Sequence, residues 1–187
     1  FSIFKILKKK KIVPHIRLSG VIGAVGKFKQ GLDFESQKDI IEKAFSIKKT
    51  SVVAISINSP GGSPVQSHLI YTYIRKQAQK NKKEVLVFME DVAASGGYLI
   101  ACAGDEIYAN SSSIVGSIGV IYSSFGLQEL IKKVGIERRI YTAGKNKSTL
   151  DPFVEEKQED IDRLKKIQLE LHADFIKVVE DSRSKKL

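Results

Sequence analysis

A serine that could act as a nucleophile lies in the short stretch AASGG (residues 93–97), directly after the apolar run 84–90. A strand that ends here and leads into a helix would place the hydroxyl of Ser95 at a helix N-terminus, where developing negative charge is stabilised. A serine hydroxyl is a poor nucleophile at neutral pH unless a neighbouring base takes its proton. Ser95 is therefore a candidate for acyl transfer, with an ordinary helix N-cap as the simpler alternative.

A second glycine-rich stretch, INSPGGSP (residues 57–64), also follows an apolar run and precedes a helical pattern. Gly61 and Gly62 let the backbone approach a ligand closely and can expose N–H groups in a concave turn. Taken alone, the stretch favours an ordinary strand-to-helix turn. Two such turns at neighbouring strand ends can face each other across the crevice where parallel sheets bind ligands. The N–H groups of Gly62 and Gly96 are then candidate donors to an oxyanion.

The base that would activate Ser95 is not decided by the residue types. The chain has three histidines: His15, His68 and His172. Only His68 lies near one of the two glycine-rich stretches, on the helical pattern that follows INSPGGSP. A triad would also require an orienting carboxylate. A lysine can serve instead when its surroundings lower its affinity for the proton. The stretch TAGKNKSTLDPF (residues 142–153) offers Lys145 and Lys147, and composition does not choose between them.

The elements that must position these residues alternate between strand and helix patterns. Expected strands cover residues 12–23, 51–59 and 84–90, and expected helices cover 34–47 and 67–81. This βαβ rhythm predicts a parallel sheet and an α/β fold. Beyond Ser95 we expect a short helix at 95–104, extended segments at 105–110 and 113–124, a helix near 127–135, a strand at 138–144 and a long amphipathic helix from Pro152 to about Arg183.

Length and composition predict one domain, residues 1–187, with a short basic segment at about 1–11. Cys102 is the single cysteine, which predicts a small buried apolar residue rather than a disulfide. The formal charge of +10 comes from dispersed lysines without aromatic residues between them, so we expect no nucleic-acid binding. Contact of KILKKKK (residues 5–11) with anionic lipid heads is favoured over it. No apolar run is long enough to span a bilayer, and localisation stays open between membrane-associated and cytoplasmic.

Four stretches together resemble the signal peptide peptidase A type of serine peptidase, within the Clp protease and crotonase fold superfamily. They are residues 57–64, 90–109, 112–120 and 142–153, in the family's order and spacing. The resemblance covers most of the chain, from about Val13 to Leu187. It implies an α/β fold of repeated β-β-α units with a parallel sheet and a long C-terminal helix.

Carried over position by position, the resemblance implies that Ser95 is the nucleophile and Lys147 the general base. Ser117, otherwise a plain turn serine beside Gly116, falls on the serine that hydrogen-bonds the lysine. Gly62 and Gly96 fall on the oxyanion donors. The implied function is an endopeptidase with a Ser-Lys pair that hydrolyses extended peptides, such as residual signal peptides, through an acyl-enzyme. We expect a homo-oligomer that uses neither a cofactor nor a metal.

The chain departs from the family pattern at both ends. We expect it to lack the N-terminal membrane anchor that many members carry, and we expect its C-terminal end to be truncated before the further strand and helix segments usual in the family. Two other classes of protein remain as alternatives. A crotonase-like acyl-CoA enzyme would share the fold and the oxyanion turns without using Ser95 as a nucleophile. A catalytically silent peptide-binding or membrane-binding scaffold would not need Lys147.

Overall fold

The computed structural model describes residues 12–23, 31–144 and 146–184. The basic segment 1–11 and the alternative base Lys145 lie outside the described residues. Contacts divide the chain into two compact units. The first comprises the described residues of Phe1–Ile118 and Phe175–Leu187, and the second is Gly119–Asp174. The expectation of one domain stays a prediction.

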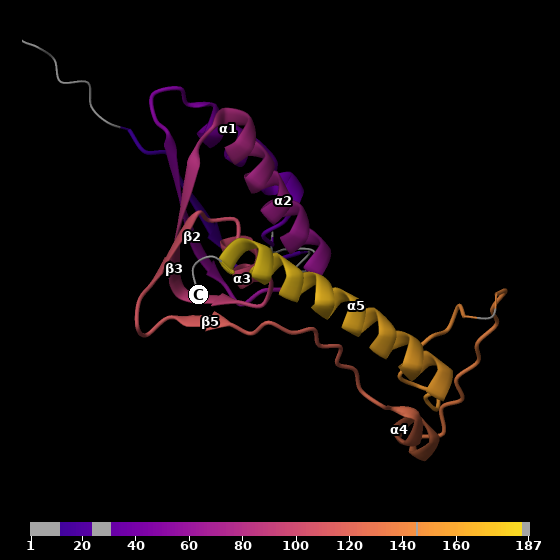
Figure 1. Cartoon of the computed structure of the whole chain (residues 1–187). Helices are drawn as coiled ribbons and strands as arrows, with labels where there is room; N and C mark the ends of the chain where they lie inside the picture. The colour runs from indigo at the N-terminus through magenta and orange to yellow at the C-terminus, as the bar shows by residue number, and fades with distance from the viewer. Residues whose placement is uncertain (1–11, 24–30, 145, 185–187) are drawn as a thin grey trace, which may run out of the picture. The chain divides into compact units, whose positions relative to one another are not determined.

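The first unit is built on a parallel sheet whose strands follow one another in the order β1-β2-β3-β4 (Figure 1). The strands are β1 (His15–Ser19), β2 (Val52–Ser59), β3 (Glu84–Ala94), β4 (Glu106–Ala109) and β5 (Ile114–Gly116). The short β5 pairs in parallel with the last residues of β3, where Ala94 lies opposite Gly116. The predicted parallel sheet is therefore confirmed. Its β3 runs through to Ala94, which brings the strand to the residue before Ser95.

Alternation along the strands places one face of the sheet in the core. Residues of β2 alternate between half-buried and fully buried, as a period of two requires. The buried apolar strand residues are Ile16, Leu18, Val53, Ile55, Ile57, Val85, Val87, Met89 and Ala93. Because β-branched side chains pack well on a pleated surface, this composition favours strands at the centre of the fold.

Three helices of the first unit carry the other half of this core: α1 (Phe34–Ser46), α2 (Pro64–Asn81) and α3 (Gly96–Ala101). Asp33 is the N-cap residue of α1, and its carboxylate accepts a hydrogen bond from the Ser36 N–H at 2.8 Å. Ser63 is the N-cap residue of α2, and a proline follows it in the first turn. Both helix starts are therefore fixed by capping residues that stand directly before them.

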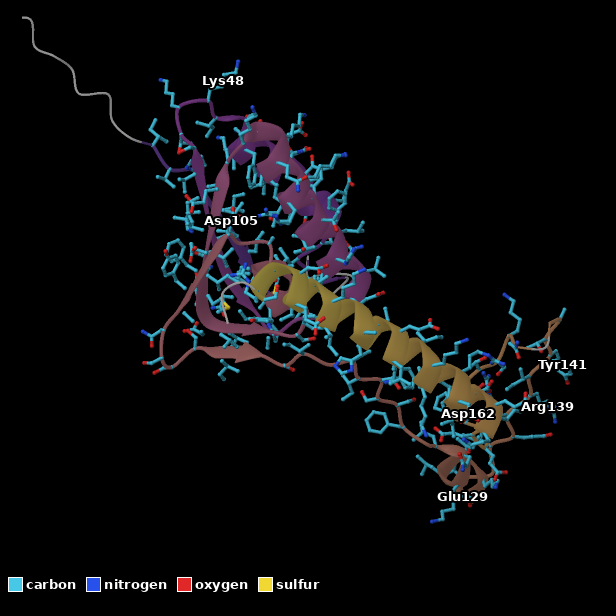
Figure 2. All side chains as sticks on the ribbon, viewed as in Figure 1. Lys48, Asp105, Glu129, Arg139, Tyr141 and Asp162 are labelled. Carbon is cyan, nitrogen blue, oxygen red and sulfur yellow. The ribbon has the colours of Figure 1, made fainter. Side chains whose placement is uncertain are left out.

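The end of α3 is fixed by charged side chains from distant parts of the chain. Asp105, labelled in Figure 2, accepts a hydrogen bond from the Val85 N–H and pairs with Arg75 at 2.9 Å. Arg75 also donates to the carbonyl of Ala103, and Arg183 donates to that of Gly104. These bonds satisfy backbone groups in the turn that leads from α3 into β4, so they hold the helix that follows Ser95.

The helix α5 (Gln158–Arg183) contributes its last residues to the first unit. Phe175 and Val178 pack against Leu99 and Cys102 in a second small apolar cluster. Cys102 is only 2% exposed, which confirms the predicted small buried residue. Burial raises the pKa of its thiol above the ordinary value, so the sulfur remains protonated at neutral pH.

The second unit contains α4 (Gln128–Lys133), the first part of α5 and irregular segments between them. Arg138 pairs with Asp151 at 3.0 Å and lies over the ring of Phe153. The N–H of Leu127 donates to the carbonyl of Pro152. These contacts join the segments on both sides of α4 to the segment before α5.

Two element predictions are wrong in this second unit. Residues 138–144 form no strand; Tyr141 is 91% exposed, and Figure 2 shows it at the outside of this segment. No strand is assigned among the described residues of this unit, so the segment has no neighbour that could pair with its N–H and C=O groups. The long helix begins at Gln158 instead of Pro152 because Asp151 accepts a hydrogen bond from the Phe153 N–H and forms a turn.

The predicted absence of a bilayer-spanning stretch can be compared with the described helices. Within the described residues, none of them is both long and apolar enough to cross a membrane.

Candidate active site

Ser95 occupies a strained turn between β3 and α3. Its backbone has φ 50° and ψ −122°, a conformation that a residue with a side chain rarely adopts. Its N–H donates to the carbonyl of Gly116 at 2.7 Å, and its carbonyl accepts from Leu99. In the described part of the chain the Ser95 hydroxyl makes no capping hydrogen bond to α3. Ser95 is therefore the N-cap residue of α3 by position, but its hydroxyl does not cap the helix.

The second glycine-rich turn lies directly against this serine. A Cβ built on Gly61 would lie 2.8 Å from the Cβ of Ser95 and 2.9 Å from the nitrogen of Gly96. Such distances are closer than real Cβ contacts allow, and Gly61 also has φ 99°, so only glycine fits here. The two turns that the sequence placed at strand ends are thus in contact within the first unit.

The proposed donors Gly62 and Gly96 flank this contact. Gly96 is the first residue of α3, so its N–H has no partner inside the helix. Gly62 is held by its neighbours: Ile22 donates to the carbonyl of Gly61 at 2.9 Å, and Ser63 donates to the carbonyl of Ile22 at 2.8 Å. Among the described residues, neither N–H group has a hydrogen-bond acceptor. Both are therefore able to bind an oxygen atom.

Ser117 lies immediately after the residue that binds the backbone of Ser95. Gly116 accepts from the Ser95 N–H, and the chain then turns sharply, with φ 97° at Gly116 and φ 54° at Ser117. Ser117 is exposed. The structure therefore brings Ser95, Ser117, Gly62 and Gly96 into one region of the first unit.

Lys147 lies on a turn of the second unit. Its N–H donates to the carbonyl of Gly144, and its side chain is exposed. The preceding Asn146 accepts a hydrogen bond from Arg163 of α5 at 3.3 Å. Because Ser95 and Lys147 belong to different units, their pairing stays a prediction.

The histidines give no support to a histidine base. His68 is exposed on α2, with its ring 6.1 Å from that of Tyr71. His15 is hydrogen-bonded to Ser56 at 2.8 Å, and His172 belongs to the second unit. Neither His15 nor His68 is hydrogen-bonded to Ser95 in the described part of the chain.

Two residues that support the site were missed by the sequence analysis. Asn58 donates from its side chain to Asp91 and accepts from the Val92 N–H, where the pairing of β2 with β3 shifts register. Ser59 accepts a hydrogen bond from the Gly61 N–H at 3.1 Å. Both lie in the stretch INSPGGSP, from which the sequence analysis selected only the glycines. A polar pair at the end of a buried strand is itself unusual and could have indicated them.

Comparison with known proteins relates the chain to a family of peptidases. The model of peptidase family S49 matches residues 77–187. A Brucella melitensis protein named Na(+)/H(+) antiporter NhaA is 60% identical over 176 residues, which are 94% of this chain and 24% of that protein. An Enterococcus faecium protein named putative signal peptide peptidase SppA is 28% identical over 182 residues, covering 94% of this chain and 52% of that protein. The chain thus spans about a quarter of the first relative and about half of the second.

A solved structure bears on the fold alone. A mutant of ClpP1 from Listeria monocytogenes matches with a TM-score of 0.51 at 14% identity, over 91% of this chain and 72% of that chain. The predicted Clp protease type of α/β fold is therefore confirmed.

Proposed function

The chain belongs to peptidase family S49, and from this premise we propose that it is the peptidase part of a serine endopeptidase that works through a Ser-Lys pair. In this proposal Ser95 is the nucleophile and Lys147 the general base. Ser117 holds the lysine amine, and the N–H groups of Gly62 and Gly96 bind the oxyanion. Ser-Lys pairs are a known variant of the nucleophile-base arrangement.

Acylation begins when the oxygen of Ser95 forms a bond to the carbonyl carbon of a substrate peptide. The hydroxyl proton passes to the uncharged amine of Lys147, and the carbonyl oxygen becomes an oxyanion that the two N–H groups stabilise. The tetrahedral intermediate collapses, the peptide C–N bond breaks, and the leaving amine takes the proton from the Lys147 ammonium. The product is an acyl ester on Ser95.

Deacylation repeats these steps with water. The Lys147 amine takes a proton from the water molecule while its oxygen attacks the ester carbon. The same two N–H groups bind the second oxyanion. The bond to Ser95 then breaks, and the proton on Lys147 returns to the serine oxygen.

The observation that supports this proposal most strongly is the strained turn at Ser95. Backbone conformations of this kind cost about 1–3 kcal/mol each and cluster at active sites. Here the hydroxyl makes no capping hydrogen bond to α3 within the described residues, and the glycine turn lies against the Cβ of Ser95. A serine that only ended a strand would not need either feature.

Extended peptides are the proposed substrates, with cleaved signal peptides as the class that the resemblance implies. We also propose that the chain assembles with copies of itself. Its fold is similar to that of a Clp protease, and its sequence matches the model of a peptidase family.

Covalent labelling tests the proposal. A fluorophosphonate should form a phosphorus–oxygen bond to Ser95 with loss of fluoride, seen by intact mass and located by peptide mapping. Ser95→Ala should give no adduct, and Lys147→Ala should be labelled at least roughly 100-fold more slowly, in the range of general-base contributions. Lys145→Ala and His68→Ala are the matched controls and should be labelled like the wild type. An adduct on another residue, or full labelling of Lys147→Ala, would contradict the proposed pair.

A further inference from the structure

Ser59 is a buried serine that the proposed reaction does not use. It is the last residue of β2, and it is 0% exposed. Its side chain is on the face of the strand that carries Val53, Ile55 and Ile57, so a hydroxyl stands where the pattern of the strand calls for an apolar residue.

The first contact of Ser59 is with the turn that carries Gly62. The hydroxyl oxygen of Ser59 (Oγ) accepts a hydrogen bond from the buried N–H of Gly61 at 3.1 Å. Gly61 has φ 99° and Gly62 has φ 147°, so this turn cannot rely on an ordinary backbone conformation to keep its shape. The hydroxyl of Ser59 therefore fixes the Pro60–Gly61 peptide, which directly precedes the peptide that carries the Gly62 N–H.

The second contact of Ser59 is with the turn that carries Gly96. A Cβ built on Gly97 would lie 2.7 Å from the Ser59 carbonyl oxygen and 3.2 Å from its Cβ. Ser59 also pairs with Ala93 near the end of β3, two residues before Ser95. One small residue thus touches both glycine-rich turns at the point where they meet.

We propose that Ser59 is a positioning residue that sets the separation of the two oxyanion donors, the N–H groups of Gly62 and Gly96. This inference rests on the proposed function. Ser59 touches neither the substrate nor Ser95 in this role; it acts through the peptide of Gly61 on one side and through the packing of Gly97 on the other. Removal of the hydroxyl frees the Gly61 side of this contact, whereas the carbonyl and Cβ that pack against Gly97 are retained in alanine. The Gly62 donor then moves relative to the Gly96 donor, and because both bind the transition state, the loss falls on kcat.

The test compares Ser59→Ala with Ser56→Ala. Ser56 lies on the same strand with its side chain on the opposite face, where it is hydrogen-bonded to His15. Steady-state hydrolysis of an extended fluorogenic peptide is measured per active site, counted by the fluorophosphonate adduct on Ser95. Ser59→Ala should lower kcat by roughly 10- to 100-fold with KM within about twofold, less than the loss of about 10²- to 10³-fold when an oxyanion donor is removed outright. Ser56→Ala should keep the wild-type kcat.

A second variant keeps the test decisive if Ser59→Ala does not fold. Ser59→Cys preserves the volume at this site and offers a sulfur, which is a weak acceptor for the Gly61 N–H. Its kcat should fall by at least roughly threefold while its thermal unfolding remains close to that of the wild type.

The outcomes separate this inference from the proposed function. Wild-type kcat per labelled site in Ser59→Ala or Ser59→Cys overturns the role of Ser59 and leaves Ser95 as the nucleophile. Activity that falls only in proportion to the unfolded fraction does the same, because it assigns Ser59 to stability alone. A wild-type protein that forms no adduct on Ser95 overturns both.

Discussion

The conformation of Ser95 is set by the backbone around it. Ser95 has positive φ, its hydroxyl makes no capping hydrogen bond to α3 within the described residues, and the absence of a side chain at Gly61 leaves room for the Ser95 Cβ. A nucleophile held this way is oriented before a substrate arrives, which is the condition for a large contribution from positioning.

The hydroxyl of Ser117 is expected to contribute to rate but not to folding. In the proposed site it hydrogen-bonds the amine of Lys147, and it is exposed, so its removal leaves no buried group without a partner. Ser117→Ala should therefore slow peptide hydrolysis by roughly 10- to 1,000-fold, the range of positioned acid-base contributions, with the unfolding temperature unchanged.

The control for this change is Ser112→Ala, another exposed serine in the segment before β5, which should retain wild-type kinetics. If kcat and KM of Ser117→Ala also match the wild type, Ser117 is only a turn residue beside Gly116.

Residue types and spacing were sufficient to predict that the turns carrying Gly62 and Ser95 lie at strand ends and meet, because glycine next to a strand end indicates a close backbone approach. They did not reveal Ser59 or Asn58. The roles of these two side chains arise from the register shift between β2 and β3, which places Ser59 opposite Ala93 although Ile57 pairs with Met89. A shift of this kind depends on packing between strands far apart in the sequence, and no local pattern encodes it.

At the scale of elements, runs of apolar residues predicted strands of the first unit, and apolar residues at helical spacing predicted the helices α1 and α2. Strand propensity misled at residues 138–144, where Ile140, Tyr141 and Thr142 favour a strand but no neighbouring strand is assigned among the described residues of this unit. Arg138 instead makes an ion pair with Asp151. Pattern reports the capacity to form a strand, whereas pairing decides whether one forms.

Strands β1 and β3 are joined across the exposed face of the sheet by Arg17 and Glu90, at 2.6 Å. The hydrogen bond from Arg17 holds the pKa of Glu90 below its ordinary value, and Asn58 and the nearby His15 lower it further. Because the carboxylate is favoured in the folded state, this stabilisation is complete above the unfolded value of about 4.3 and is lost as the pH falls through the folded value.

Glu90→Gln should therefore lower the unfolding temperature at pH 7, by at most about 4 °C since the pair is partly exposed. The difference from the wild type should shrink at about pH 2, because the protonated fraction of Glu90 rises as the pH falls through its lowered pKa. Circular dichroism melts at the two pH values measure this. Glu129→Gln, which removes the exposed pair with Lys132, is the control and should show no difference at either pH (Figure 2). A difference for Glu90→Gln that is the same at both pH values would contradict the assignment.

At the scale of the whole molecule, the proposed machinery draws on both units. The nucleophile, the oxyanion donors and Ser117 belong to the first unit, and Lys147 belongs to the second. The assignment of Lys147 comes from the motif TAGKNKSTLDPF within the region matched by peptidase family S49. A lysine base is therefore the central claim that activity measurements must test.

The most direct test is the pH dependence of peptide hydrolysis by the wild type and by Lys147→Ala, measured with a fluorogenic peptide between pH 6 and 10. A lysine amine accepts the serine proton only when it is uncharged, and that form increases with pH, so wild-type activity should rise from neutral into alkaline pH. Lys147→Ala should lack activity throughout. A profile that is flat above a single inflection near roughly pH 6.5, the range of a histidine, would contradict the account, as would substantial activity in Lys147→Ala.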